Sequence, residues 1–192
     1  MRLEESNKRS GQAGSTLIEV LIATLILATG ILTMAQLFMA STATNVNAKN
    51  DTFATALAEQ KIEQLRALTW GFDRNGLPIS DFASDTSVNP ESDSGGTGLQ
   101  PSPATALQQN TSGYVDHVGS NGVILGNGVT PPNGAVYTRR WSIEPLPTNP
   151  NNTLIIQVLV TPNRVRGQAD LGNVNRLQNE ARMITVKTRK AQ

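Results

Sequence analysis

One carboxylate, Glu19, stands at the edge of a long uncharged stretch. From Val20 to Ala48 the chain has no charged residue, and Val20–Ala40 consists mostly of Leu, Ile, Ala, Val and Met. A carboxylate at the centre of a membrane-spanning helix costs roughly 3 kcal/mol on insertion scales. Near the helix end the cost is lower, but an ionised group there still needs a partner or a function. Glu19 is therefore the first candidate functional residue.

Catalytic chemistry has few candidates. His117 is the only histidine, and it lies in a polar stretch between Asp116 and Val118, where we expect a surface-exposed side chain. The sequence has no Gly-x-Ser-x-Gly, no glycine-rich phosphate loop after a strand and no metal-ligand spacing. It also has no cysteine, so it offers neither a disulfide nor a thiol. We predict that the chain is not an enzyme and uses no cofactor.

The uncharged stretch predicts a membrane helix. The 21 residues of Val20–Ala40 would span about 30 Å as a helix, the thickness of a bilayer core. They are apolar on all sides, unlike an amphipathic helix. A secretory signal has a shorter apolar core, roughly 7–15 residues. A plain signal anchor would fit the length and the basic Lys8-Arg9 flank, but it would not explain Glu19.

The residues before Glu19 complete a family pattern. The basic pair Lys8-Arg9 is followed by a short neutral run, by Gly14 and then by Ser15-Thr-Leu-Ile-Glu. This order resembles the prepilin signal of type IV pilins and pseudopilins, which has a short basic leader, a glycine and an apolar helix with Glu fifth after the glycine. The family usually has Phe where this chain has Ser15, whereas the glycine on which the family depends is present.

The resemblance implies processing. A prepilin peptidase would cut between Gly14 and Ser15, the new amino group of Ser15 would be methylated, and the apolar helix would stay on the mature protein. Cleavage after Gly11 would place Glu19 eighth, so Gly14 is favoured. In the family this glutamate pairs with the free amino terminus of a neighbouring subunit. The resemblance gives those two roles to Glu19 and Ser15.

The helix is expected to run from Thr16 to about Thr69, because the first proline of the chain is Pro78. Its second half repeats apolar residues near one face: Phe53, Leu57, Ile62, Leu65 and Leu68. Charged residues are expected on the other face: Glu59, Lys61, Glu63 and Arg66. Such a helix would be roughly 80 Å long, which suits a first half in lipid and a second half packed under a head domain.

Residues 72–135 form a predicted irregular region rich in Gly, Pro and Ser, with a net charge of −5. Only Gly113–Val115 and Gly122–Leu125 favour short strands. Some pseudopilins hold calcium in a loop, and three acids here could supply oxygens: Asp85, Glu91 and Asp93. Their spacing matches no known calcium loop, so a solvated acidic loop is the favoured interpretation.

Three strands are predicted in residues 136–192, two of them alternating and the middle one β-branched: Val136–Glu144, Thr153–Thr161 and Ala181–Arg189. Joined by loops, they form an antiparallel meander. In the last strand we expect Ile184 and Val186 to face inward.

The same residues, 136–192, carry nine bases and three acids. The bases are not interleaved with stacking aromatics, so nucleic acid is a less favoured partner. A solvated face, or a face that meets the acidic segment of the same or the next subunit, is the favoured interpretation.

The head also resembles a subgroup. The Tyr-x-Arg-x-Trp pattern of residues 137–141 and the Ile-Thr-Val-Lys-Thr run of 184–188 are similar to the heads of PilV-like minor pilins. The helix of residues 58–65 is similar to theirs and to the I-type pseudopilin of type II secretion. We therefore expect an α+β fold, in which the second half of a long N-terminal helix packs on a small antiparallel sheet head. The chain should divide into five parts: leader 1–14, membrane or filament-core helix 15–44, amphipathic helix 45–71, irregular region 72–135 and sheet 136–192.

The resemblance implies a minor pilin-like subunit that takes part in type IV pilus assembly or priming. The alternatives are a pseudopilin of a type II secretion system and a pilus-tip module for binding, adhesion or DNA uptake. The implied partners are prepilin peptidase, the major and other minor pilins through the N-terminal helix, the inner-membrane assembly platform and the membrane. The implied location is the inner membrane, as a single-pass protein with its head outside the cytoplasm, and then the pilus, cell surface or periplasm.

Overall fold

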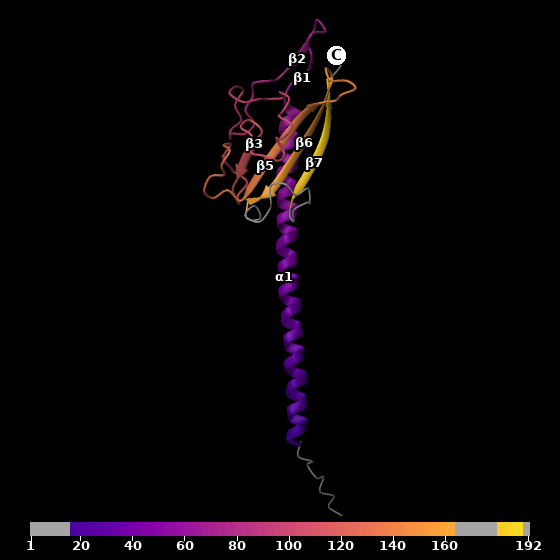
Figure 1. Ribbon diagram of the computed structural model, residues 1–192, viewed down its shortest axis with the longest axis vertical. Coiled ribbons are helices and arrows are strands. Elements are labelled where there is room, and N and C mark those ends of the chain that lie inside the picture. Colours follow the sequence, from indigo (N-terminus) through magenta and orange to yellow (C-terminus); the bar gives the residue numbers. More distant parts are fainter. Residues whose placement is uncertain (1–15, 164–179, 190–192) are drawn as a thin grey trace, which may run out of the picture. The chain divides into compact units, whose positions relative to one another are not determined.

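The computed structural model describes residues 16–163 and 180–189. It has an α+β layout of one long helix and two antiparallel sheets (Figure 1). The chain divides into two compact units, which we call the anchor unit (Met1–Asn45) and the head unit (Val46–Gln192). The elements, in chain order, are α1 (Leu17–Ala67), β1 (Trp70–Phe72), β2 (Pro78–Ser80), β3 (Val115–Val118), β4 (Ile124–Gly126), β5 (Tyr137–Pro145), β6 (Thr153–Pro162) and β7 (Ala181–Thr188).

Helix α1 is continuous over 51 residues, as the absence of a helix breaker predicts. In the anchor unit its side chains are exposed. In the head unit one face is buried, and the residues on it follow a helical period: Ala54, Leu57, Ala58, Lys61, Ile62 and Leu65. The second half of α1 is therefore the helical layer of the head.

The larger sheet has five strands in the order β4-β3-β5-β6-β7, and each neighbouring pair is antiparallel. Strands β5, β6 and β7 form the predicted meander. Strands β2, β3 and β4 lie in residues 72–135, and β2 pairs with β1 in a separate two-stranded sheet. Strands β3 and β4 overlap the two short strands that the sequence favoured in this region, whereas the β1–β2 pair was not predicted.

The core lies between α1 and the inner face of this sheet, where Trp141, Ile143 and Ile156 are at most 1% exposed. Strand β5 is buried on its outer face as well. Beyond the residues of β5 that pair with β3, Ser102 lies along the edge of β5. Its N–H donates to the Ile143 carbonyl, and its Oγ accepts from the Ile143 N–H. These bonds satisfy backbone groups that burial would otherwise leave unpaired.

The prediction for the faces of β7 was wrong. Ile184 and Val186 point outward and are 61% and 57% exposed. The register pairs Met183 with Val158 and Thr185 with Ile156. Because paired residues share a face of the sheet and Val158 is buried, the odd-numbered residues of β7 face the helix. Alternation predicted the strand, whereas only the pairing with β6 determined its inward face.

Candidate functional site

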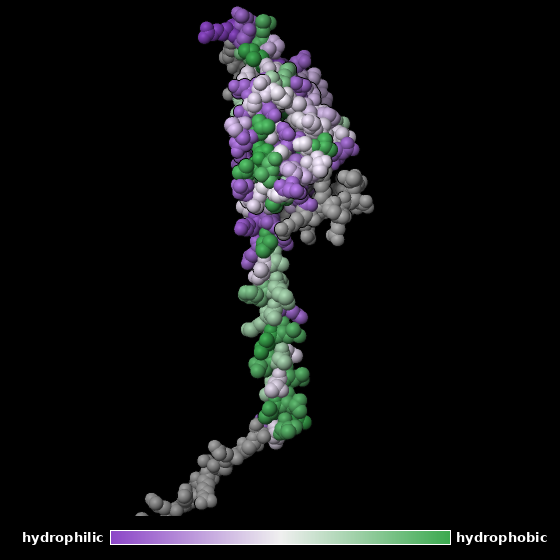
Figure 2. All heavy atoms as spheres, turned by 90° about the vertical axis from the view of Figure 1, so that its left-hand side faces the viewer, coloured by the Kyte–Doolittle hydropathy of each residue, from purple (hydrophilic) through white to green (hydrophobic). Residues whose placement is uncertain are grey.

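In the anchor unit, apolar side chains are exposed on every side of α1. The large hydrophobic residues from Leu17 to Met39 are 52–82% exposed, and they colour this part of the helix green in Figure 2. The helix is long and apolar enough to cross a membrane. Since water does not tolerate so much contiguous apolar surface, this segment requires lipid or protein around it.

The threonine hydroxyls in this segment have partners within the helix. Thr24 donates to the Leu21 carbonyl at 2.9 Å, Thr29 to the Ile26 carbonyl at 2.9 Å and Thr33 to the Gly30 carbonyl at 2.8 Å. Hydroxyls that bond to their own helix add little cost in an apolar medium. The threonines therefore do not conflict with a membrane location.

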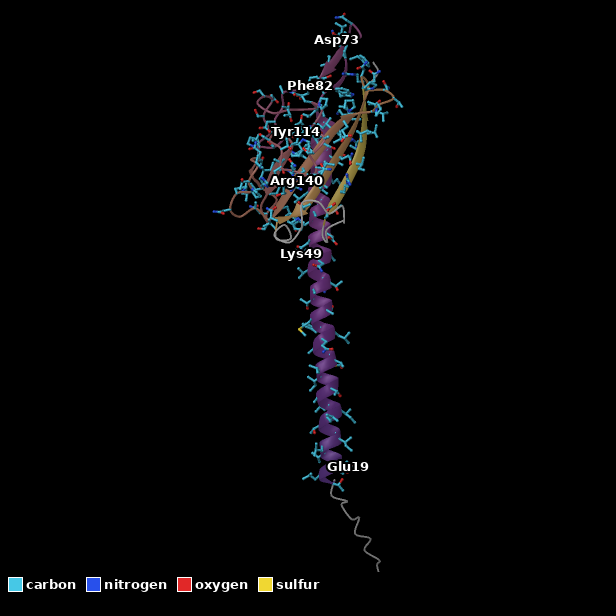
Figure 3. The ribbon with its side chains drawn as sticks, in the orientation of Figure 1. Glu19, Lys49, Asp73, Phe82, Tyr114 and Arg140 are labelled. Atoms are coloured by element: carbon cyan, nitrogen blue, oxygen red, sulfur yellow. The ribbon has the colours of Figure 1, made fainter. Side chains whose placement is uncertain are left out.

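Glu19 lies in the first turn of α1 (Figure 3). Its backbone N–H donates to the Thr16 carbonyl at 3.0 Å, so Glu19 stands at the amino-terminal end of the helix. It is the one ionisable side chain between Thr16 and Ala48. The predicted cleavage and methylation residues, Gly14 and Ser15, lie outside the described residues.

The weak metal candidates Asp85, Glu91 and Asp93 all lie in the described part of the chain, where no three His, Cys, Asp or Glu side chains gather in a group that could hold a metal ion. The Asp85 carboxylate accepts hydrogen bonds from the Ser87 backbone and hydroxyl instead. Asp85 therefore shapes its own turn.

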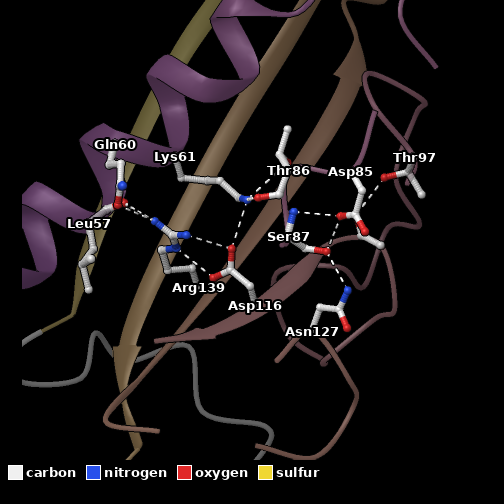
Figure 4. A network of polar contacts seen from close by, with 11 residues as sticks. Leu57, Gln60, Lys61, Asp85, Thr86, Ser87, Thr97, Asp116, Asn127 and Arg139 are labelled. Atoms are coloured by element: carbon white, nitrogen blue, oxygen red, sulfur yellow. Dashed lines mark hydrogen bonds and ion pairs between the residues drawn. The ribbon is translucent and has the colours of Figure 1, made fainter. Parts of the chain in front are cut away.

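The head unit contains three charged side chains that are buried together (Figure 4), and we call Lys61, Asp116 and Arg139 the charge cluster. Asp116 Oδ1 and Oδ2 accept from Arg139 Nε at 2.8 Å and from Nη2 at 2.9 Å, a bidentate pair. Lys61 Nζ lies 3.0 Å from Asp116 Oδ2. All three residues are at most 1% exposed, so the cluster has a structural position and not a ligand-binding one.

Each cation of the cluster has further partners that tie separate elements together. Lys61 Nζ donates to the Thr86 carbonyl and lies 3.9 Å from the centre of the Trp141 ring. Arg139 Nη1 donates to the Leu57 carbonyl at 3.3 Å and to Gln60 Oε1 at 3.0 Å. The cluster thereby joins α1, β3, β5 and the segment around residue 86.

The pKa values of Lys61 and Asp116 reflect two opposing effects, burial away from water and attraction between the opposite charges. Burial lowers the pKa of Lys61 from 10.5 to about 8, although Asp116 works against this shift. Burial alone would raise the pKa of Asp116, but Lys61 and Arg139 hold it below its usual value. Asp116 is thus ionised at neutral pH and neutralises one of two buried cations.

Sequence reasoning missed the charge cluster. It placed Lys61 on the polar face of the helix, whereas the structure buries that side chain completely. A signal was present, because Lys61 lies four residues from both Leu57 and Leu65 and so falls on their face of the helix. The pairing of Arg139 with Asp116 does agree with the interpretation that bases of the sheet meet the acidic segment of the same chain.

The expectation of a surface-exposed His117 was also wrong. His117 is fully buried in β3, with Nδ1 2.9 Å from Thr138 Oγ1 and Nε2 2.8 Å from the Gly128 carbonyl. The polar residues around it suggested a loop, but pairing of β3 with β5 places Thr138 directly across from it. Its partners make it a satisfied interior histidine.

Comparison with family models, curated proteins and solved structures found no match to this chain.

Lys61 predicts a pH dependence of stability. Between pH 8 and 10.5 the folded head has released the Lys61 proton while the unfolded chain still holds it, so this group makes stability rise with pH across that window. Relative to Lys61→Met, the free energy of unfolding of wild type should therefore increase by roughly 2–3 kcal/mol from pH 8 to 10.5. Urea unfolding of both proteins across this range measures the difference, and equal pH profiles would contradict the shifted pKa.

Proposed function

We propose that this chain is a minor pilin-like subunit, processed by prepilin peptidase, that takes part in type IV pilus assembly or priming. One observation carries the proposal. Glu19 is the only ionisable side chain of α1 between Leu17 and Ala48. The large hydrophobic side chains of this part of the helix are exposed. A plain membrane anchor has no use for a carboxylate in that place.

The assembly step follows from this arrangement. Before assembly, lipid surrounds the apolar part of α1. In a fibre, the same surface is buried against the helices of neighbouring subunits in a head-to-tail packing. A carboxylate buried there is tolerated only with a counterion, which the methylated amino group of a neighbour's Ser15 supplies. The charge pair then selects the register between subunits.

The α+β head supports the proposal in a second way. A helix whose first part is exposed and apolar and whose second part belongs to a folded sheet domain can present that domain outside a membrane or a fibre. The charge cluster holds this second part to the sheet. The head then remains folded whether lipid or protein surrounds the first part.

Processing tests the proposal most directly. The mature protein purified from membranes should begin at Ser15 with one added methyl group, as determined by mass spectrometry. Gly14→Ala should be processed poorly, and a bulkier residue at that position should not be processed at all. Gly11→Ala is the matched control, since the rival glycine should be dispensable. An intact Met1, or a cut beyond Ala40, would rule out the pilin-like assignment.

A further inference from the structure

The two edges of the five-stranded sheet differ in their protection. Strand β4 has three residues, and its pairing with β3 is interrupted by a register shift, a combination that blunts an edge. Strand β7 has eight residues, pairs with β6 over eight consecutive positions without a shift and has no second strand neighbour among the described residues. Within residues 16–163 and 180–189, β7 is therefore the longer and more regular of the two edge strands.

The outer face beside this edge is apolar at its centre. Ile184 and Val186 are 61% and 57% exposed, and the register places Val186 beside Ile155 on β6. One base, Arg182, precedes them and contacts Gln157 across the strands at 3.0 Å. We call Arg182, Ile184 and Val186 the β7 patch. With two apolar side chains and a base at one end, the β7 patch is complementary to a partner surface that carries apolar and acidic groups.

The opposite side of the head carries such acids. The register runs as one row across the sheet, from Asp116 through Arg139 and Val160 to Ala181. At the Asp116 end of this row, Lys61 Nζ donates a hydrogen bond to the Thr86 carbonyl. A backbone bridge then joins the neighbouring Asp85 to Ser92. Glu91 and Asp93, on either side of Ser92, are exposed. This side of the head shows many hydrophilic side chains in Figure 2.

One side of the head is basic, at Arg182, and the opposite side is acidic, at Glu91 and Asp93. This distribution favours a contact in which two heads of the same orientation lie side by side. In a symmetric dimer with its two-fold axis perpendicular to the sheet, the two β7 strands would pair antiparallel. The helix α1 of each copy would then lead into its head from the opposite end of the dimer. Copies anchored in one membrane by α1 enter from the same end. A head-to-tail contact does not meet this obstacle.

We propose that the β7 patch of one head contacts the acidic loop of residues 85–93 in a second copy of this chain. The proposal rests on the assembly function proposed above and names the surfaces that the heads use. Arg182 faces Glu91 and Asp93 of the neighbour, while Ile184 and Val186 lose their exposure to water.

Cysteine cross-linking in membranes tests this contact, because the chain has no cysteine of its own. Full-length Ile184→Cys and Ser94→Cys proteins, with different tags, are co-expressed and treated with a short bis-maleimide. Ser94 is exposed and adjoins Asp93, so the acids stay in place. A mixed dimer should form when both variants are present, and neither variant alone should form one. Ile184→Cys with Glu63→Cys, an exposed position on α1, is the matched control.

Charge reversal gives a second readout on the same pair. Adding Arg182→Glu to the Ile184→Cys protein should lower the mixed dimer about tenfold, because like charges then face one another. Adding Glu91→Lys and Asp93→Lys to the partner should restore it. Dimers of Ile184→Cys with itself, an absent mixed dimer or no rescue would overturn the proposal. N-terminal mass spectrometry of the same samples reports processing separately, so failure of this contact is distinguishable from failure of the assembly function.

Discussion

Replacement of Asp116 with alanine is expected to destabilise the head unit by about 3–5 kcal/mol. The substitution removes the counterion that Lys61 and Arg139 share in the interior of the head. A domain of this size has a total stability of roughly 5–15 kcal/mol, so the loss would take a large part of it. The melting temperature of the isolated head, residues 46–192, should fall by roughly 10–15 °C, as followed by circular dichroism.

Two variants show whether the effect comes from the buried charges. Glu63→Ala removes the exposed ion pair with Arg66, and it should cost less than about 0.5 kcal/mol. Replacing the charge cluster as a unit with Lys61→Met, Asp116→Leu and Arg139→Met should recover most of the stability, because no unpaired charge remains. A triple variant no more stable than Asp116→Ala would show that the hydrogen bonds to the 86 segment and α1 matter more than the charges.

Replacement of Glu19 with glutamine is expected to leave cleavage and membrane insertion intact and to remove the protein from fibres. Insertion should even become easier, since a polar cost is removed. In the assembly proposed above, the amino terminus of a neighbour would lose its counterion at a cost of about 3–5 kcal/mol, a more than ~100-fold change at equilibrium. The measurement is the fraction of tagged protein in sheared fibres.

A matched control separates this effect from a general loss of charge on α1. Glu59→Gln removes an exposed carboxylate from the head part of the same helix and should enter fibres normally. If Glu19→Gln blocks processing, Glu19 belongs to the recognition pattern of the peptidase instead. If the variant is processed and enters fibres as well as wild type, the charge-pair mechanism is wrong for this chain.

Local patterns determined the long helix and the three longest strands of this protein. The uncharged run and the absence of a proline before Pro78 specify one long helix, because helix formation depends on neighbouring residues. The alternating and β-branched runs after residue 136 specify β5, β6 and β7 for the same reason. The α+β layout and a helix able to cross a membrane were therefore predictable from the sequence.

Contacts between distant residues depended on the tertiary structure. Lys61, Asp116 and Arg139 lie on α1, β3 and β5, and only the packing of the helix on paired strands brings them together. Periodicity within a single segment cannot indicate which charge will lie opposite another, so it identified neither the Lys61–Asp116 pair nor the Arg139–Asp116 pair. The spacing of Lys61 from two buried leucines was the one local sign of its burial.

The faces of β7 show the same limit. Strand alternation separates Ile184 and Val186 from Met183 and Thr185, but it leaves open which set is buried. Hydrophobicity favoured the first set, whereas the register with β6 buries the second. A sheet places a side chain according to its partner across the strands, and that partner is fixed only when the chain folds. The sequence by itself thus determined the long helix and strands β5, β6 and β7, while tertiary pairing decided which of their side chains form the core and which are exposed.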